Sequence, residues 1–343
     1  MPANKPITIG ETTVRPGEQV SIDLPVADLY TGTSLSMPVK VICGRRAGPV
    51  LFVSAAIHGD ELNGVEIIRK LLKRKALASL RGTLLAAPVV NIHGFLDLSR
   101  YLPDRRDLNR SFPGSATGSI AGRLAHTFVT EIVDNADFGI DLHTGAINRS
   151  NLPQIRANLA DPTTRELAEA FGAPVILNST IRDGSLRQCA AERGFPMLLY
   201  EAGEALRFDE ISIRAGLQGV LRIMRHIGML PKTKSRSKAV PVIAESSSWV
   251  RAPTSGVVSH RVSLGTRVVT GQRLAVIGDP LAEFEVPVKA KFDGIVIGQS
   301  NLPLAHEGDA LFHVAAFKRL SKAELNVDEF VASHSEQNEQ DRL

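Results

Sequence analysis

The sequence contains only two cysteines, Cys43 and Cys189, among 343 residues. Two thiols cannot form the disulfide framework of a small secreted protein, so both are expected to be reduced. Aromatic residues make up 5% of the chain, the net charge is +4, and no basic stripe is interleaved with aromatic residues. Nucleic-acid binding is therefore not predicted. Residues 1–6 lack the apolar segment of a secretory signal, and no run approaches the ~18 apolar residues of a membrane span. These absences predict a cytoplasmic globular protein without a membrane partner.

The chain length and the order of the predicted elements indicate more than one domain. A chain of 343 residues predicts two domains, or one large α/β domain with an appendage. Residues 1–48 predict a β-rich lead-in, after which apolar strands alternate with amphipathic helices up to residue 230. This alternation predicts an α/β domain at residues 1–230, with a mixed central sheet flanked by helices. The predicted strands are residues 51–57, 82–90, 138–142, 175–177 and 196–200, and the predicted helices are residues 62–80, 120–135, 163–172, 185–193 and 208–229.

The sequence changes in character after a basic linker at residues 231–247. Residues 248–320 hold short β-type runs that repeat: the pattern of residues 250–258 returns at 288–296, and that of residues 271–277 returns at 308–314. Two matched halves predict a second, smaller all-β domain of barrel-sandwich type. Residues 321–343 form a charged tail, expected to be a helix followed by a disordered end.

The C-terminal repeat resembles biotinyl and lipoyl carrier domains, which are also built from two such halves. A carrier presents a lysine on the exposed hairpin between the halves, whereas this hairpin reads Gly-Asp-Pro-Leu-Ala-Glu at residues 278–283. The sequence therefore favours a structural role for this domain, either limiting access to a site or mediating homo-oligomer formation.

Two predicted interior strands stop at a histidine. The apolar run Leu51–Ile57 precedes His58, with Glu61 three residues later, and the strand at residues 138–142 precedes His143. Because sites in α/β sheets assemble at the carboxyl ends of strands, we expect these side chains to converge. Two imidazoles and one carboxylate form the ligand set of a catalytic zinc that keeps one position open for water, so one Zn²⁺ per chain is predicted. Taken alone, His58 and Glu61 also fit a surface turn that opens a helix.

Two further carboxylates lie near these predicted strand ends. A metal-activated water needs a general base, and Glu201 follows the strand at residues 196–200. Its alternative role is to cap the next helix. Asp141 lies on the same side of its strand as His143, and we expect it either to orient that ligand or to cap a buried turn.

A long polar loop at residues 91–118 supplies arginines. Loops of that length inside a compact domain are usually functional. From this loop we assign Asn109 and Arg110 to a substrate carboxylate and Arg100 to the oxyanion of a tetrahedral intermediate, because a guanidinium suits both anions. Arg105 and Arg106 are expected to be solvated loop charges.

Four motifs, in this order, resemble those of the succinylglutamate desuccinylase/aspartoacylase family within the zinc-carboxypeptidase clan. They are His58-Gly-Asp-Glu61, Asp107-Leu-Asn-Arg-Ser-Phe-Pro-Gly114, Asp141-Leu-His-Thr-Gly145 and Glu201-Ala-Gly203. The resemblance covers residues 45–230 and implies a zinc-carboxypeptidase-like fold with a β-rich C-terminal domain. It also implies zinc bound by His58, Glu61 and His143, Glu201 as base and proton shuttle, and a substrate carboxylate held by Asn109 and Arg110. Arg156 is a candidate for binding a second carboxylate.

These features predict a zinc-dependent amidohydrolase that removes an acyl group from an N-acyl amino acid. One alternative is a zinc carboxypeptidase acting on a peptide tail. Another is a non-catalytic binding or carrier protein that has kept the fold.

Overall fold

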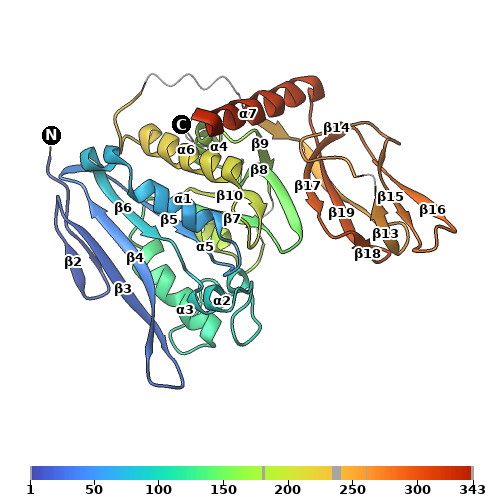
Figure 1. Cartoon of the computed structure of the whole chain (residues 1–343). Helices are drawn as coiled ribbons and strands as arrows, with labels where there is room; N and C mark the ends of the chain where they lie inside the picture. The colour runs from blue at the N-terminus through green and yellow to red at the C-terminus, as the bar shows by residue number, and fades with distance from the viewer. Residues whose placement is uncertain (1, 180–181, 234–240, 260, 341–343) are drawn as a thin grey trace.

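The fold is built on one continuous mixed sheet of thirteen strands (Figure 1). The computed structural model describes residues 2–179, 182–233, 241–259 and 261–340. The strands of this sheet are β3 (Gln19–Asp28), β4 (Ser34–Cys43), β5 (Arg46–Ala55), β6 (Arg81–Ala87), β7 (Phe138–Gly145), β8 (Arg149–Ala157), β9 (Val175–Asn178), β10 (Met197–Glu204), β11 (Val242–Ala244), β12 (Ser246–Arg251), β14 (Arg267–Val268), β17 (Gly294–Ser300) and β19 (Ala310–Ala316). Their order is β12-β19-β17-β8-β10-β7-β5-β6-β4-β3, with β9 also on β8, β11 on β9 and β14 on β17.

Strand direction changes twice within the central part of this sheet. Strands β6, β5, β7 and β10 run parallel to one another. Strand β4 is antiparallel to β6, and β8 is antiparallel to β10. Two smaller sheets lie outside it, one of β1 (Ile7–Ile9) and β2 (Thr12–Val14), and one of β13 (Gly256–Ser259), β15 (Arg273–Gly278), β16 (Glu285–Lys289) and β18 (Leu304–Ala305).

Helices cover both faces of the central sheet, as the sequence predicts (Figure 1). The helices are α1 (Asn63–Leu72), α2 (Ile92–Leu96), α3 (Ile120–Phe128), α4 (Pro162–Phe171), α5 (Leu186–Glu192), α6 (Glu210–His226) and α7 (Leu320–Gln340). Helices α1, α4 and α6 pack on one face, and α3 and α5 pack on the other. Strand β5 is apolar on both sides because both of its faces are covered. Leu51 and Val53 pack in the core beneath α1, α4 and α6, while Phe52 packs in the core beneath α3 and α5.

Some predicted boundaries differ from the observed ones. The predicted helix at residues 62–80 divides into α1 and a 3₁₀ turn at Lys75–Ser79, and the predicted helix at residues 120–135 ends in a π turn at Val129–Val133. Strand β8 is absent from the sequence prediction. Its segment contains Pro153, which lacks an amide donor and argues against a regular interior strand.

Strand β5 ends earlier than the apolar run predicts. It stops at Ala55, and Ala56 has a φ of 49°. The chain therefore turns before His58, and Leu62 leads into α1. The loop between β5 and α1 carries the His58 and Glu61 side chains.

The C-terminal β region, defined here as residues 246–316, contains two similar halves. Strands β12, β13, β14 and β15 in the first half are followed by β16, β17, β18 and β19 in the second. The sequence predicts a separate domain here, but β17 pairs antiparallel with β8, with Asn151 opposite Gly298. This pairing joins two segments that are far apart in the chain, so no local sequence pattern predicts it. The predicted linker at 231–247 contains β11 and the start of β12, while residues 234–240 lie outside the described residues.

The hairpin between the two halves is observed where the repeat places it. Residues 279–284 connect β15 to β16 and include no lysine. Helix α7 then returns to the α/β part, where the Arg214 side chain on α6 donates a hydrogen bond to the His334 carbonyl.

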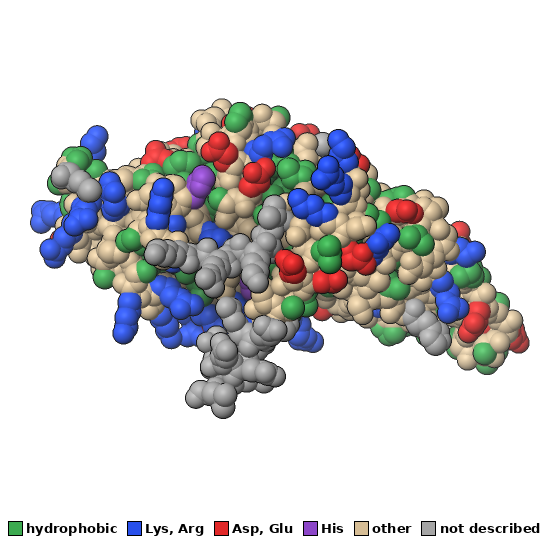
Figure 2. Space-filling model, turned by 90° about the horizontal axis from the view of Figure 1, so that it is seen from above, with side chains coloured by type: hydrophobic (Ala, Val, Ile, Leu, Met, Phe, Trp, Pro, Cys, Tyr) green, Lys and Arg blue, Asp and Glu red, His purple; other side chains and the backbone are tan. Residues whose placement is uncertain are grey.

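Charge is unevenly distributed over the face seen from above (Figure 2). Lys and Arg side chains gather at the end remote from the C-terminal β region, and acidic side chains mix with basic ones elsewhere. Lys73 and Arg74, at the end of α1, are exposed, as expected for the solvated side of that helix. Within the described residues, no helix combines the length and apolar character needed to cross a bilayer.

Gly64 tests how α1 is held against the strands below the site. A Cβ at this position would lie 2.7 Å from Ala55 Cβ and 2.8 Å from Leu142 Cβ. We expect Gly64→Ala to lower the free energy of unfolding by about 1–3 kcal/mol, because the added methyl group overpacks the interface.

Gly122 in α3 is the control, since the nearest atom to a Cβ there is 3.5 Å away. Gly122→Ala should leave stability unchanged or raise it by up to ~1 kcal/mol. Denaturant unfolding measures both, and wild-type stability in Gly64→Ala would contradict this packing.

Candidate active site

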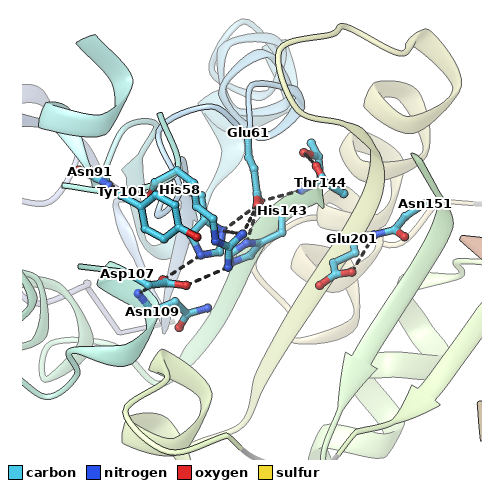
Figure 3. A network of polar contacts seen from close by, with 12 residues as sticks. His58, Glu61, Asn91, Tyr101, Asp107, Asn109, His143, Thr144, Asn151 and Glu201 are labelled. Atoms are coloured by element: carbon cyan, nitrogen blue, oxygen red, sulfur yellow. Dashed lines mark hydrogen bonds and ion pairs between the residues drawn. The ribbon is translucent and has the colours of Figure 1, made fainter. Parts of the chain in front are cut away.

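Three buried side chains converge at the end of the parallel strands. His58 and Glu61 come from the loop after β5, and His143 lies in β7. Glu61 Oε1 is 2.7 Å from His58 Nδ1, and Glu61 Oε2 is 2.8 Å from His143 Nδ1. One potential ligand atom from each residue lies within 4.8 Å of the others. The structure thus brings together the three residues that the sequence predicts as metal ligands (Figure 3).

Mutual attraction offsets the cost of burying these charges. Each of the three side chains is at most 4% exposed. Burial raises the pKa of Glu61, but His58 and His143 outweigh it and bring the pKa well below its usual range. Burial likewise lowers the pKa of His143, but Asp141 and Glu61 outweigh it and raise the pKa well above its usual value. The cluster therefore holds a negative charge firmly between two imidazoles.

Two outer carboxylates hold the far sides of the imidazole rings. Asp141 Oδ2 is 2.6 Å from His143 Nε2, and Asp107 Oδ1 is 3.1 Å from His58 Nε2. Asp141 is itself held by the Ser54 hydroxyl at 2.8 Å. A carboxylate on Nε2 favours a proton on that nitrogen and leaves Nδ1 for a ligand bond. Asp141 thus contacts His143 as one of its two expected roles requires, whereas the contact of Asp107 with His58 is not foreseen from sequence.

Glu201 lies beside the cluster on the neighbouring strand. Strands β10 and β7 pair in parallel with Glu201 opposite His143, so the two backbones are one strand spacing apart, about 4.8 Å. Glu201 Oε2 is 3.0 Å from an Arg156 guanidinium nitrogen and accepts a hydrogen bond of 2.9 Å from Asn151 Nδ2. The contact with Arg156 gives that arginine a partner that the sequence does not predict.

The loop residues chosen from sequence also reach the site. One nitrogen of Arg100 lies 3.4 Å from Glu61 Oε1, and the other donates to Asp107 Oδ2 at 2.9 Å. Burial opposes the charge on Arg100, but Glu61 and Asp107 outweigh it and raise its pKa. Asn109 and Arg110 line the same pocket, and Asn109 Oδ1 accepts a hydrogen bond from the Leu186 amide at the start of α5.

The pocket contains further residues that sequence reasoning did not find. Its cavity volume is about 160 Å³. Arg149 and Asn151 reach it from β8, Arg187 from α5, and Trp249 from the C-terminal β region. Burial, with Arg156 nearby, lowers the pKa of Arg187 to about 10. These residues carry no motif, because they meet only through the pairing of distant strands and helices.

Trp249, which lines this pocket, is held in place by two neighbours. Its ring stacks on His313 with 4.9 Å between centroids, and the Arg149 guanidinium lies 5.3 Å from its centroid. Burial and the charge of Arg156 lower the pKa of His313 to about 3, so that ring is neutral at ordinary pH. Trp249 is the single tryptophan of the sequence, and its fluorescence can therefore report on this pocket.

Residues 47–227 match the model of the succinylglutamate desuccinylase/aspartoacylase catalytic domain. The chain belongs to this family. Among curated proteins, the N-alpha-acetyl-L-2,4-diaminobutyric acid deacetylase of Halomonas elongata is 26% identical over 308 residues, which cover 86% of this chain and 90% of that protein.

Two solved structures show the same architecture over nearly the whole chain. A succinylglutamate desuccinylase/aspartoacylase from Rhodobacter sphaeroides is 27% identical, with a TM-score of 0.78, covering 88% of this chain and 97% of that one. The ectoine utilization protein EutE from Ruegeria pomeroyi, in its product-bound form, is 24% identical with a TM-score of 0.80, covering 91% and 99%. The fold expected from the family resemblance, including the smaller β-rich C-terminal region, is confirmed.

Removal of one imidazole should abolish metal binding. We expect the protein to bind one divalent ion per chain, and His58→Ala or His143→Ala to lose it, because two ligands are too few for a tight site. Affinity should also weaken as the pH falls through the raised pKa of His143, where protons compete for the ligand nitrogen. Elemental analysis and chelator competition over a series of pH values measure both effects.

His226→Ala provides the matched control, since His226 is an exposed histidine at the end of α6. It should bind metal as the wild type does. A folded wild type without affinity for any divalent ion would contradict the metal assignment, as would full metal retention in His143→Ala.

Proposed function

We propose that this protein is a zinc-dependent hydrolase that releases an amino acid from its N-acyl derivative. The observation that carries the proposal is the buried His58, Glu61 and His143 cluster with Glu201 opposite His143 on the next strand. Family membership and the 26% identity to a deacetylase support a reaction at an N-acyl bond.

The donor set of the cluster fits zinc. Two imidazole nitrogens and a carboxylate suit Zn²⁺, and three protein ligands leave a position open, as in catalytic sites. Both Nδ1 atoms face Glu61, while Asp141 and Asp107 hold the Nε2 atoms. A zinc ion held there would lower the pKa of water to about 7 and polarise a carbonyl oxygen.

Glu201 has the arrangement of a proton carrier. Arg156 and Asn151 both contact Oε2, while Oε1 accepts no hydrogen bond from the described part of the chain. Oε1 can therefore take a proton from the attacking water and later deliver it to the departing amine. Glu201 lies close to the cluster, because its backbone is paired with that of His143.

Arginine and asparagine side chains supply the remaining roles. We assign the oxyanion of the tetrahedral intermediate to Arg100, whose guanidinium lies beside Glu61. We assign the α-carboxylate of the substrate to Asn109, through its amide nitrogen, and to the exposed guanidinium of Arg110. Arg156 remains a candidate for a second carboxylate, although part of its guanidinium is used by Glu201.

The size of the pocket favours a small substrate over a peptide tail. A cavity of about 160 Å³, with Trp249 in its lining, suits a short acyl group and one amino acid. The fully assembled cluster and the hairpin without lysine both oppose a carrier role.

Glu201→Gln separates catalysis from metal binding. We expect the variant to keep its metal and its fold while turnover falls by about 10²- to 10⁴-fold, the usual contribution of a positioned acid or base. Glutamine retains the oxygen and the size of the side chain but cannot carry the proton. Steady-state kinetics with metal analysis decides, and near-normal turnover would remove Glu201 from this role.

A substrate panel tests the reaction class itself. We expect the zinc-loaded enzyme to release free amino acid from N-acetyl or N-succinyl amino acids, and to act far more slowly on tri- and tetrapeptides, which the pocket cannot enclose. Amine release measured across the panel gives kcat/KM for each compound. Faster hydrolysis of the peptides would favour a carboxypeptidase, and no hydrolysis of any compound would overturn the proposal.

A further inference from the structure

Both donors to Glu201 come from one strand, but their spacing is unexpected. Arg156 and Asn151 of β8 each contact Oε2 of Glu201. They are five residues apart, an odd number that would place their side chains on opposite faces of a regular strand. In a regular β8, only one of the two could face the base.

A β-bulge in β8 brings both side chains to the same face. Glu201 pairs with Gln154 and Gly203 pairs with Asn151, so two residues of β8, Leu152 and Pro153, lie opposite one residue of β10. The additional residue shifts the alternation, and Asn151 joins the face that carries Arg156. Bulges are common beside active sites, where they redirect a side chain.

The C-terminal β region supplies the space for the Asn151 side chain. Gly298 of β17 pairs with Asn151 on one side and with His313 on the other. A Cβ at Gly298 would lie 2.9 Å from Asn151 Oδ1 and 3.2 Å from His313 Cβ. Gly298 does not have a positive φ, so the glycine is needed for space and not for backbone conformation.

His313 cannot yield to such a Cβ as easily as Asn151 can. Its ring is buried, stacks on Trp249, and lies 3.0 Å from the Ser247 hydroxyl through Nε2. The amide group of Asn151, at the end of a flexible side chain, can move more easily. A methyl group at Gly298 would therefore displace this amide from Glu201.

We propose that Asn151 is a positioning residue for the general base, and that Gly298 of the C-terminal β region sets its orientation. The Asn151 amide holds Oε2 of Glu201, which keeps Oε1 directed at the reacting atoms. This inference rests on the proposed role of Glu201. It gives the C-terminal β region a part in catalysis in addition to forming the pocket wall.

Asn151→Ala, Asn151→Asp and Gly298→Ala test the proposal, with N-acetyl and N-succinyl amino acids as substrates. We expect Asn151→Ala and Gly298→Ala to lower kcat about tenfold, with KM changed less than about twofold, as for other residues that orient a catalytic group. Asn151→Asp should cause a larger loss of kcat, since it replaces the amide donor with a second carboxylate beside the first.

A double substitution distinguishes positioning from general damage. If Gly298→Ala acts through Asn151, it should lower kcat by less than about twofold more in the Asn151→Ala background. Additive losses would overturn the assigned role of Gly298. Should Gly298→Ala fail to fold, the two Asn151 variants decide the role of Asn151.

Ser150→Ala is the control in the adjacent position, because the Ser150 hydroxyl contacts Asn301 and Glu204 and not Glu201. Its kcat and KM should match those of the wild type. If Glu201→Gln abolishes turnover while Asn151→Asp keeps normal kcat, this inference fails alone. Near-normal turnover in Glu201→Gln would overturn the role of Glu201 and this inference together.

Discussion

The burial of the Glu61 carboxylate between two imidazoles is the constraint on which the rest of the site depends. A lone carboxylate at 2% exposure would be costly. Here His58 and His143 hold one oxygen each, and the Thr144 amide donates to Oε2 at 2.9 Å. The strand order of the sheet has to bring these groups together, and the parallel pairing of β5 with β7 does so.

Each side of this cluster is supported by a different part of the fold. Asp141 and Ser54 form a buried chain behind His143, from two adjacent strands. Asp107, from the polar loop, contacts both His58 and Arg100. Figure 3 shows Asp107 and Asn109 on one side of the cluster, and Glu201 with Asn151 on the other. The lining of the pocket therefore reaches from this loop across the cluster to β8.

The C-terminal β region is bound into this arrangement through strand pairing. Strand β17 extends the sheet from the edge of β8, and a row of paired residues runs from Trp249 through His313 and Gly298 to Asn151. Carrier-like repeats need only a self-contained core. This one also shares buried contacts with the α/β part, as Leu152 of β8 packs with Ile295 and Ile297 of β17.

The sequence by itself indicated most of the helices and strands of the α/β part, although not β8, as well as the repeat and the candidates His58, Glu61, His143 and Glu201. It could do so because apolar periodicity and short motifs are local properties. Only the tertiary structure decided which residues surround Glu201. Asn151 faces it through a bulge and Arg156 is held against it, while Gly298 and Trp249 belong to the C-terminal β region. The physical reason is that strand register and the space around a side chain depend on pairing between distant segments, and neither leaves a local pattern.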